Sequence, residues 1–190
     1  MSELRIYDEN NPKQAERVLT RFADIQAALA EIEVGFERWE ASRQLDAMAS
    51  QDEVIEAYRG PIDQLMKKYG FQSVDVISLT ANHPQKQAMR EKFLSEHTHD
   101  DFETRFFVEG EGLFNIRKGG RVYATLCTRG DLLNLPAHTT HWFDLGPHPQ
   151  LKAIRLFTTP EGWVANFTGD KIADRFPKLE APHYPLARAA

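Results

Sequence analysis

The sequence predicts a mainly β protein in which one β-barrel domain is wrapped by a helical N-terminal segment. Between residues 94 and 157, short runs of strand-forming residues alternate with turn residues, a spacing typical of sandwiches and barrels. Before residue 94, apolar residues recur at helical spacing in several short segments. The chain has 190 residues and is 42% hydrophobic, which suffices for one such domain with a sizeable core.

The first half of the chain is expected to alternate helices with strands. Helical spacing predicts helices over residues 22–32, 54–69 and 85–93. Gly60 and Pro61 are expected to break the second of them into two pieces. Strands are expected over residues 4–7, as an edge strand, and over residues 34–39 and 74–79.

The second half is expected to supply the barrel strands. Their sequences are ETRFFVEG, GLFNIRK, GRVYATLCT, GDLLNLP, THWFDLG and LKAIRLF. Lys118-Gly119-Gly120 predicts a hairpin, and one helical turn is expected after Gly169. We interpret residues 1–190 as a single domain, with an α/β segment over 1–93 that wraps the barrel, a barrel core over 94–158 and a C-terminal segment over 159–190.

Composition excludes several classes of partner. The net charge is −5 and no run of Lys or Arg occurs, so neither nucleic acid nor an anionic membrane is an expected partner. No apolar run approaches the about 20 residues needed to span a bilayer. The single cysteine, Cys127, cannot form an internal disulfide, and the charged N-terminus does not resemble a secretory signal. We therefore expect a cytoplasmic protein, and a monomer because no heptad pattern is visible.

The segment EHTHDDFETRFF carries a candidate metal site. His97 and His99 are two residues apart on an expected strand, so their imidazoles face the same side, and Glu103 shares that parity. Two imidazoles and one carboxylate suit a first-row transition metal and leave open positions for substrate and oxygen. His141 opens a later strand and can complete the set from across the barrel.

Each of these residues has an ordinary structural alternative. A lone H-x-H is a weak pattern, because His97 and His99 could be strand histidines that face solvent. The added Glu103, and the later pattern of Gly130, Pro136 and His141, favour the metal site. The other histidines are expected in turns or on the surface: His83, His138, His148 and His183.

Arg105 is difficult to explain by packing alone. An inward-pointing arginine two residues from a metal ligand must pair with a carboxylate or face an anion, and Arg155 raises the same question. The aromatic residues Phe107, Phe143 and Trp163 could form a pocket wall, or they could be ordinary core residues.

These motifs resemble a known family. His97-x-His99-x3-Glu103-x6-Gly110 resembles the first cupin motif, and Gly130-x5-Pro136-x4-His141 resembles the second. The segments EHTH, RFFVEGEGLF, PAHTTHWFDLG, AIRLF and PEGWVANFTGDKIA resemble the bacterial type of acireductone dioxygenase.

The resemblance implies a double-stranded β-helix barrel, jelly-roll-like, that binds one Fe(II) or Ni(II) ion. Matched residue by residue, it implies four metal ligands: His97, His99, Glu103 and His141. It implies that Arg105 holds an anionic substrate oxygen and that Glu96 is an acid–base or orienting group. Phe93, Phe143 and Trp163 would line the pocket for a methylthio tail.

The implied substrates are O2 and acireductone, a dihydroxy-keto-methylthiopentene of methionine salvage. With iron, the expected products are a methylthio keto acid and formate. With nickel, they are methylthiopropionate, formate and carbon monoxide. Two alternatives stay open: another metal cupin enzyme (a thiol, quercetin or aromatic dioxygenase, or an isomerase), and a non-catalytic cupin binding module.

Overall fold

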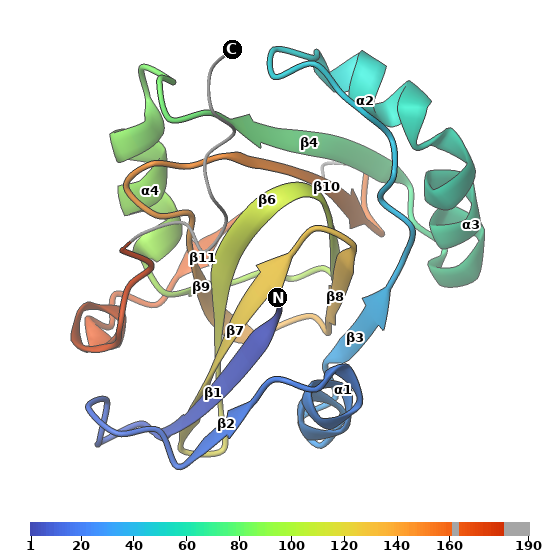
Figure 1. Cartoon of the computed structure of the whole chain (residues 1–190). Helices are drawn as coiled ribbons and strands as arrows, with labels where there is room; N and C mark the ends of the chain where they lie inside the picture. Colours follow the sequence, from blue (N-terminus) through green and yellow to red (C-terminus); the bar gives the residue numbers. More distant parts are fainter. Residues whose placement is uncertain (161–163, 181–190) are drawn as a thin grey trace.

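Two antiparallel sheets that share strand β6 form a barrel (Figure 1). The computed structural model describes residues 1–160 and 164–180. The first sheet has the order β11-β5-β9-β6-β7-β1-β2. The second runs β4-β10-β6-β8-β3. The strands are β1 (Glu3–Asp8), β2 (Arg17–Leu19), β3 (Gly35–Arg38), β4 (Ser73–Leu79), β5 (His97–Thr98), β6 (Glu103–Lys118), β7 (Arg121–Thr128), β8 (Asp131–Leu135), β9 (Thr140–Asp144), β10 (Leu151–Phe157) and β11 (Asn166–Phe167). The predicted mainly β architecture is confirmed.

Strand β6 joins the two sheets and is longer than the sequence predicts. ETRFFVEG and GLFNIRK were expected as separate strands, but they form one strand of 16 residues. Its first half pairs with β8 and β10, and its second half pairs with β7 and β9. Gly110 lies where the strand passes from one sheet to the other, with φ +73°, a conformation that glycine adopts without strain. A Cβ there would lie 1.6 Å from the carbonyl oxygen of Gln150.

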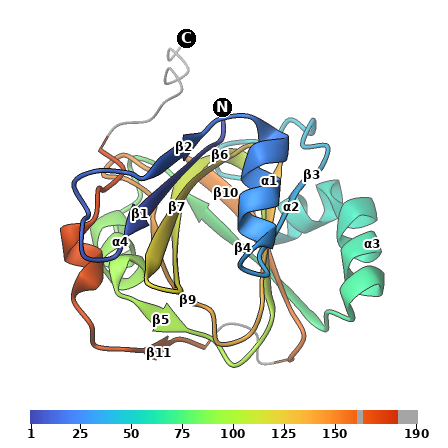
Figure 2. The same cartoon turned by 90° about the horizontal axis from the view of Figure 1, so that it is seen from below.

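The helices cover the outside and one end of the barrel (Figures 1 and 2). They are α1 (Phe22–Ala30), α2 (Gln51–Ala57), α3 (Arg59–Tyr69), α4 (Lys86–Leu94) and the 3-10 helix η1 (Ile172–Arg175). A capping box between Ser50 and Glu53 fixes the start of α2. Among the described residues, no helix has the length and apolar composition needed to cross a bilayer.

Two local expectations are wrong. The strand expected as an edge, β1, lies between β2 and β7, and the edge is the short β2, which was not expected. The helical stretch breaks at Tyr58, whose φ of −111° and ψ of 21° are not helical, and not at Gly60-Pro61. Pro61 fits within the first turn of α3, because the first N–H groups of a helix have no partner within it.

Within residues 1–160 and 164–180, buried apolar side chains form three clusters. The first fills the barrel interior and includes Phe107, Phe114 and Phe143. The second packs α2 and α3 against the outer face of the second sheet through residues such as Phe106 and Ile154. The third packs η1 against the outer face of the first sheet. Alternate residues of the central strands therefore serve two different clusters, as the period of a β-strand requires.

We predict that Gly110→Ala destabilises the protein by about 3 kcal/mol or more, because it combines backbone strain with a backbone clash. Gly70 is the matched control. Its φ is +74°, but a Cβ there would meet nothing within 4 Å, so Gly70→Ala should cost only about 1 kcal/mol. Urea unfolding of both variants measures the difference. Equal losses would show that the contact with Gln150 is not a constraint.

Candidate metal centre

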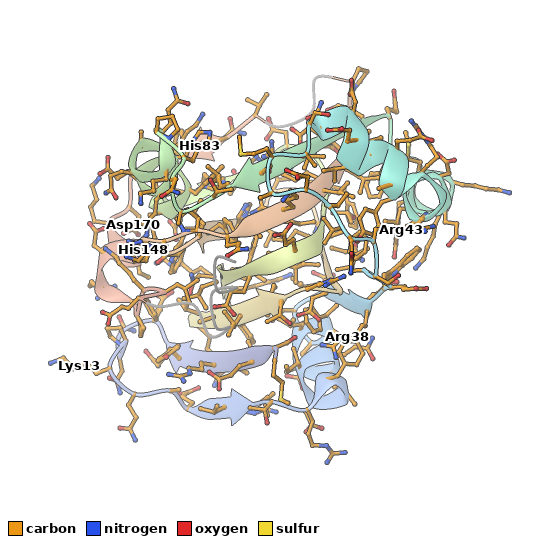
Figure 3. All side chains as sticks on the ribbon, turned by 45° about the horizontal axis from the view of Figure 1, so that its top comes forward. Lys13, Arg38, Arg43, His83, His148 and Asp170 are labelled. Atoms are coloured by element: carbon orange, nitrogen blue, oxygen red, sulfur yellow. The ribbon has the colours of Figure 1, made fainter. Side chains whose placement is uncertain are left out.

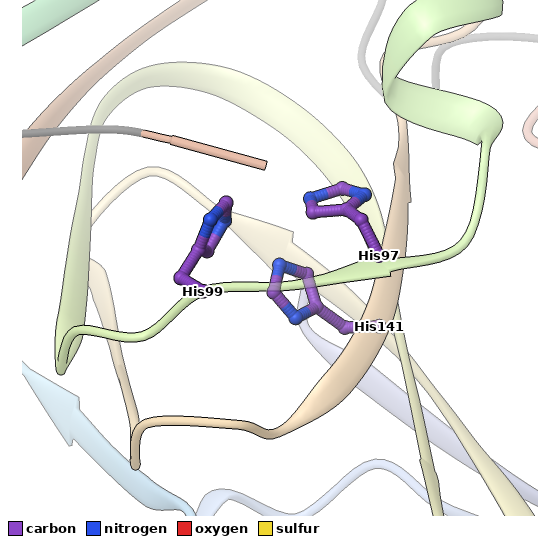
Figure 4. A group of neighbouring side chains, drawn as sticks. All are labelled: His97, His99 and His141. Atoms are coloured by element: carbon purple, nitrogen blue, oxygen red, sulfur yellow. The ribbon is translucent and has the colours of Figure 1, made fainter. Parts of the chain in front are cut away.

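Three histidines from two neighbouring strands and the loop after β5 meet inside the barrel (Figure 4). His97 on β5 lies directly opposite His141 on β9, and their ring centroids are 4.4 Å apart. His99 follows β5, with its ring 5.0 Å from that of His97 and 5.1 Å from that of His141. One ring nitrogen from each residue lies within 4.8 Å of the other two, and all three residues are buried. This geometry is suitable for binding one metal ion.

The orientation of each imidazole is fixed from behind by a backbone carbonyl. The Nδ1 atom of His97 lies 2.7 Å from the Ser95 oxygen, and that of His141 lies 2.7 Å from the Thr139 oxygen. The Nδ1 atom of His99 lies 2.6 Å from the oxygen of Val164. A carbonyl can only accept, so each Nδ1 carries the proton and each Nε2 presents a lone pair. Metal-binding histidines commonly have this arrangement.

Burial keeps the imidazoles of His97 and His141 neutral near pH 7. It lowers the pKa of His97 to about 4 and that of His141 to about 3, and neighbouring imidazoles add to both shifts. A neutral imidazole is the form that binds a metal. The Nε2 atom of His141 is buried and makes no hydrogen bond within residues 1–160 and 164–180.

Glu103, the first residue of β6, adds a carboxylate to this group. It is 1% exposed, and its Oε2 lies 3.3 Å from His99 Nε2 and 3.7 Å from His141 Nε2. Burial alone would raise the pKa of the Glu103 carboxyl, but the charge of Arg105 and the contact with His99 hold that pKa well below its usual value. The structure thus brings all four candidate ligands together.

Arg105 points into the same interior from β6. Its Nη2 donates to Glu103 Oε1 at 2.7 Å. Its guanidinium carbon lies 5.0 Å from the ring centre of Phe114 and 4.7 Å from that of Phe143. Nε and Nη1 are buried and have no hydrogen-bond partner within the described residues. Two donors of a buried cation are therefore available to an anion.

Aromatic rings surround the arginine and one histidine. Phe143 contacts both Phe93 and Phe107, with ring centres 6.2 Å apart in each case. Phe114, which no sequence motif indicates, stacks on His141 at 5.1 Å. A Cβ at Gly112 would lie 2.2 Å from the Phe143 ring, so glycine leaves the space that this ring occupies. Trp163 lies outside the described residues.

Glu96 is buried beside the metal centre, and its side chain is already held. Its Oε1 accepts a hydrogen bond of 2.8 Å from Thr168, and its Oε2 lies 3.4 Å from Arg117 Nη1. Its backbone oxygen accepts a hydrogen bond from the backbone nitrogen of Thr168. These contacts connect β5 to the segment that follows β11.

The remaining histidines lie elsewhere. His83 and His148 are at the periphery of the molecule (Figure 3). The side chain of His138 is 72% exposed and lies 3.4 Å from Asp100, while His183 falls outside the described residues. The carbonyls that hold the imidazoles were not predicted from sequence. No pattern indicates Val164, because it lies 65 residues from His99.

Comparisons with known proteins agree with this geometry. The model of the ARD/ARD′ family matches residues 3–165. The chain is 55% identical over 180 residues to the acireductone dioxygenase of Pseudomonas aeruginosa strain UCBPP-PA14, an alignment that covers 95% of this chain and 99% of the relative. The acireductone dioxygenase of Methylococcus capsulatus strain Bath is also 55% identical, with 95% and 96% covered.

A solved structure supports the fold. The acireductone dioxygenase from Bacillus anthracis, with a cadmium ion in its active centre, matches with a TM-score of 0.77 at 28% identity and covers 88% of this chain and 98% of that one. The predicted cupin barrel is confirmed by this match. With a family model that spans most of the chain and relatives at 55% identity, the chain belongs to the ARD/ARD′ family.

Proposed function

We propose that this protein is a metal-dependent dioxygenase that cleaves acireductone with O2 in methionine salvage. The observation that carries the proposal is the convergence of three imidazoles and the Glu103 carboxylate in a buried site that Arg105 also enters. Membership of the ARD/ARD′ family supports the choice of substrate. The presence of all four donors argues against a binding module that has lost its metal.

The donor set fits a divalent transition metal. Neutral imidazoles with one carboxylate suit iron and nickel better than a soft thiolate-binding ion. His97, His99, Glu103 and His141 would hold the ion. When bound, such an ion lowers the cost of ionising an enediol. The related Bacillus anthracis structure contains cadmium in its active centre, which supports a divalent metal here.

Arg105 would bind the negative charge of the ionised enediol. Its Nη2 is already used by Glu103, and the two aromatic rings fix the plane of the guanidinium. Nε and Nη1 lie on opposite sides of the guanidinium plane's axis, so either one can then donate to a substrate oxygen without rearrangement. A preorganised donor in a dry interior stabilises charge more than a mobile donor in water does.

Phe93 and Phe143 would bind the apolar tail of the substrate, together with Trp163. The buried contact between the first two supports this role. For Glu96 we propose the orienting role, because Thr168 and Arg117 hold its carboxylate while its backbone leads directly into His97. We further propose a cytoplasmic monomer.

We predict that His97→Ala, His99→Ala and His141→Ala each weaken metal binding by more than ~100-fold, since even loss of an outer partner of a ligand costs about 10- to 100-fold. Metal content after dialysis against buffer measures the effect. His148→Ala is the control and should keep the metal of the wild type. Full occupancy in all three variants would refute the ligand assignment.

Arg105→Lys should keep its metal but lose about 10- to 100-fold in kcat/KM. Lysine keeps the charge but loses the planar fork, so the fixed hydrogen bond from the guanidinium to a charged oxygen is lost. Steady-state kinetics with metal analysis of the same sample tests this. Unchanged kinetics would leave Arg105 only its structural contact with Glu103.

One polypeptide, stripped and reloaded, should give two outcomes. Iron-loaded protein should produce the methylthio keto acid and formate, and nickel-loaded protein should release carbon monoxide with methylthiopropionate and formate. Acireductone is mixed with each form without oxygen, oxygen is then added, and headspace gas and acids are measured. Oxygen uptake no faster than in buffer, for both forms, would overturn the acireductone assignment.

A further inference from the structure

A second arginine lies directly opposite Arg105 in the barrel wall. Arg155 on β10 is the cross-strand partner of Arg105 on β6. It shares a face of β10 with Leu151 and Ala153, which belong to the cluster inside the barrel. Like charges directly opposite each other in a sheet are destabilising, so this arrangement needs a compensating interaction.

Asp75 supplies part of that compensation. It is the cross-strand partner of Arg155 on the other side, in β4. Its carboxylate accepts from Arg155 Nε at 2.8 Å and from Nη2 at 2.6 Å. The Arg155 side chain is 10% exposed and that of Asp75 is 37% exposed. Asp75, Arg155 and Arg105 therefore form one row across three neighbouring strands. These strands are β4, β10 and β6 (Figure 1).

The charges of this row and of Glu103 balance. Two guanidinium groups face two carboxylates, and Glu103 is also a candidate metal ligand. A divalent ion would add two positive charges to a buried region, where unbalanced charge is costly. Arg105 meanwhile keeps two buried donors without a partner among the described residues. The site with its metal thus suits a small ligand with two negative charges.

We propose that Arg155 is a further substrate-binding residue, which together with Arg105 holds a dianionic metal-chelating ligand. Asp75 holds Arg155 in place and moderates its charge. Identifying that ligand with the ionised enediol rests on the proposed function. The inference that the two arginines bind a planar dianion is independent of the proposed function. Oxalate is a suitable probe because it chelates divalent ions through two oxygens.

Two variants of the row separate binding from simple structural support. Arg155→Met removes positive charge and should weaken oxalate binding by about 10-fold or more. Asp75→Asn keeps a hydrogen-bond acceptor but removes negative charge, so it should tighten binding by roughly threefold. If the pair only ties β10 to β4, both substitutions break the same tie and act in the same direction.

The experiment is calorimetric titration of oxalate into nickel-loaded protein, with metal content and thermal unfolding measured for each variant. Lys152→Met is the matched control. Lys152 is also a buried cation of β10 paired to a carboxylate, Glu109 at 2.7 Å, but it lies on the opposite face of the strand. Its variant should bind oxalate within about twofold of the wild type. Arg155→Lys, which keeps the charge, replaces Arg155→Met if that variant does not fold and should bind more weakly than the wild type.

Opposite changes in affinity for the Arg155 and Asp75 variants would support the proposal. Changes in the same direction, no change in the Arg155 variant, or no binding of oxalate to the wild type would overturn it. Turnover of acireductone is measured separately on the same samples. The KM for acireductone should rise in the Arg155 variant and fall in the Asp75 variant. Failure of the wild type to consume acireductone would refute the proposed function while the oxalate result still decides the role of Arg155.

Discussion

The buried carboxylate of Glu103 is the charge on which the arrangement of the barrel interior depends. One oxygen accepts from Arg105, and the other faces the imidazoles of His99 and His141. An isolated carboxylate in such a place would take up a proton, because burial disfavours the charged form. Arg105 keeps it ionised, and the two imidazoles beside it can share one cation with it. The hydrogen bond between Glu103 and Arg105 also orients Arg105. Glu103 therefore positions both the candidate metal ligands and the donors that would bind an anion.

This contact exists only because β6 runs through both sheets. The strand begins with Glu103 in the second sheet and, beyond Gly110, lies beside β9 in the first. Phe114 is thereby placed opposite Phe143 and stacked on His141. The positive φ of Gly110 and its close approach to Gln150 make the bend specific to glycine. Two short strands, as expected from the sequence, would not link the carboxylate to the aromatic rings so directly.

Strand alternation and motif spacing in the sequence are enough to reveal the four candidate metal ligands. His97, His99 and Glu103 are close in the chain, and His141 was found through the second motif. Interactions between distant segments have no such local signal. Asp75 pairs with Arg155, which lies 80 positions later in the chain. Strand β1 lies inside its sheet because the three-residue strand β2 pairs with it and forms the edge. The break before α3 was misplaced for a related reason, since Pro61 is acceptable in a first helical turn.

The segment HWFD, one of the patterns that carry the family resemblance, has a structural role at each of its four positions. Its four residues alternate across β9, so His141 and Phe143 face the interior while Trp142 and Asp144 face outward. Outside, Asp144 is 1% exposed, pairs with Arg90 of α4 at 2.7 Å and accepts from the backbone nitrogen of Leu179. Trp142 packs on the 3-10 helix η1 through its Phe176 neighbour. Trp142 and Asp144 thus hold the C-terminal segment against the barrel. An earlier residue of that segment, Val164, supplies the carbonyl that orients His99. One strand therefore positions a metal ligand on its own inner face and helps to hold the chain that orients another.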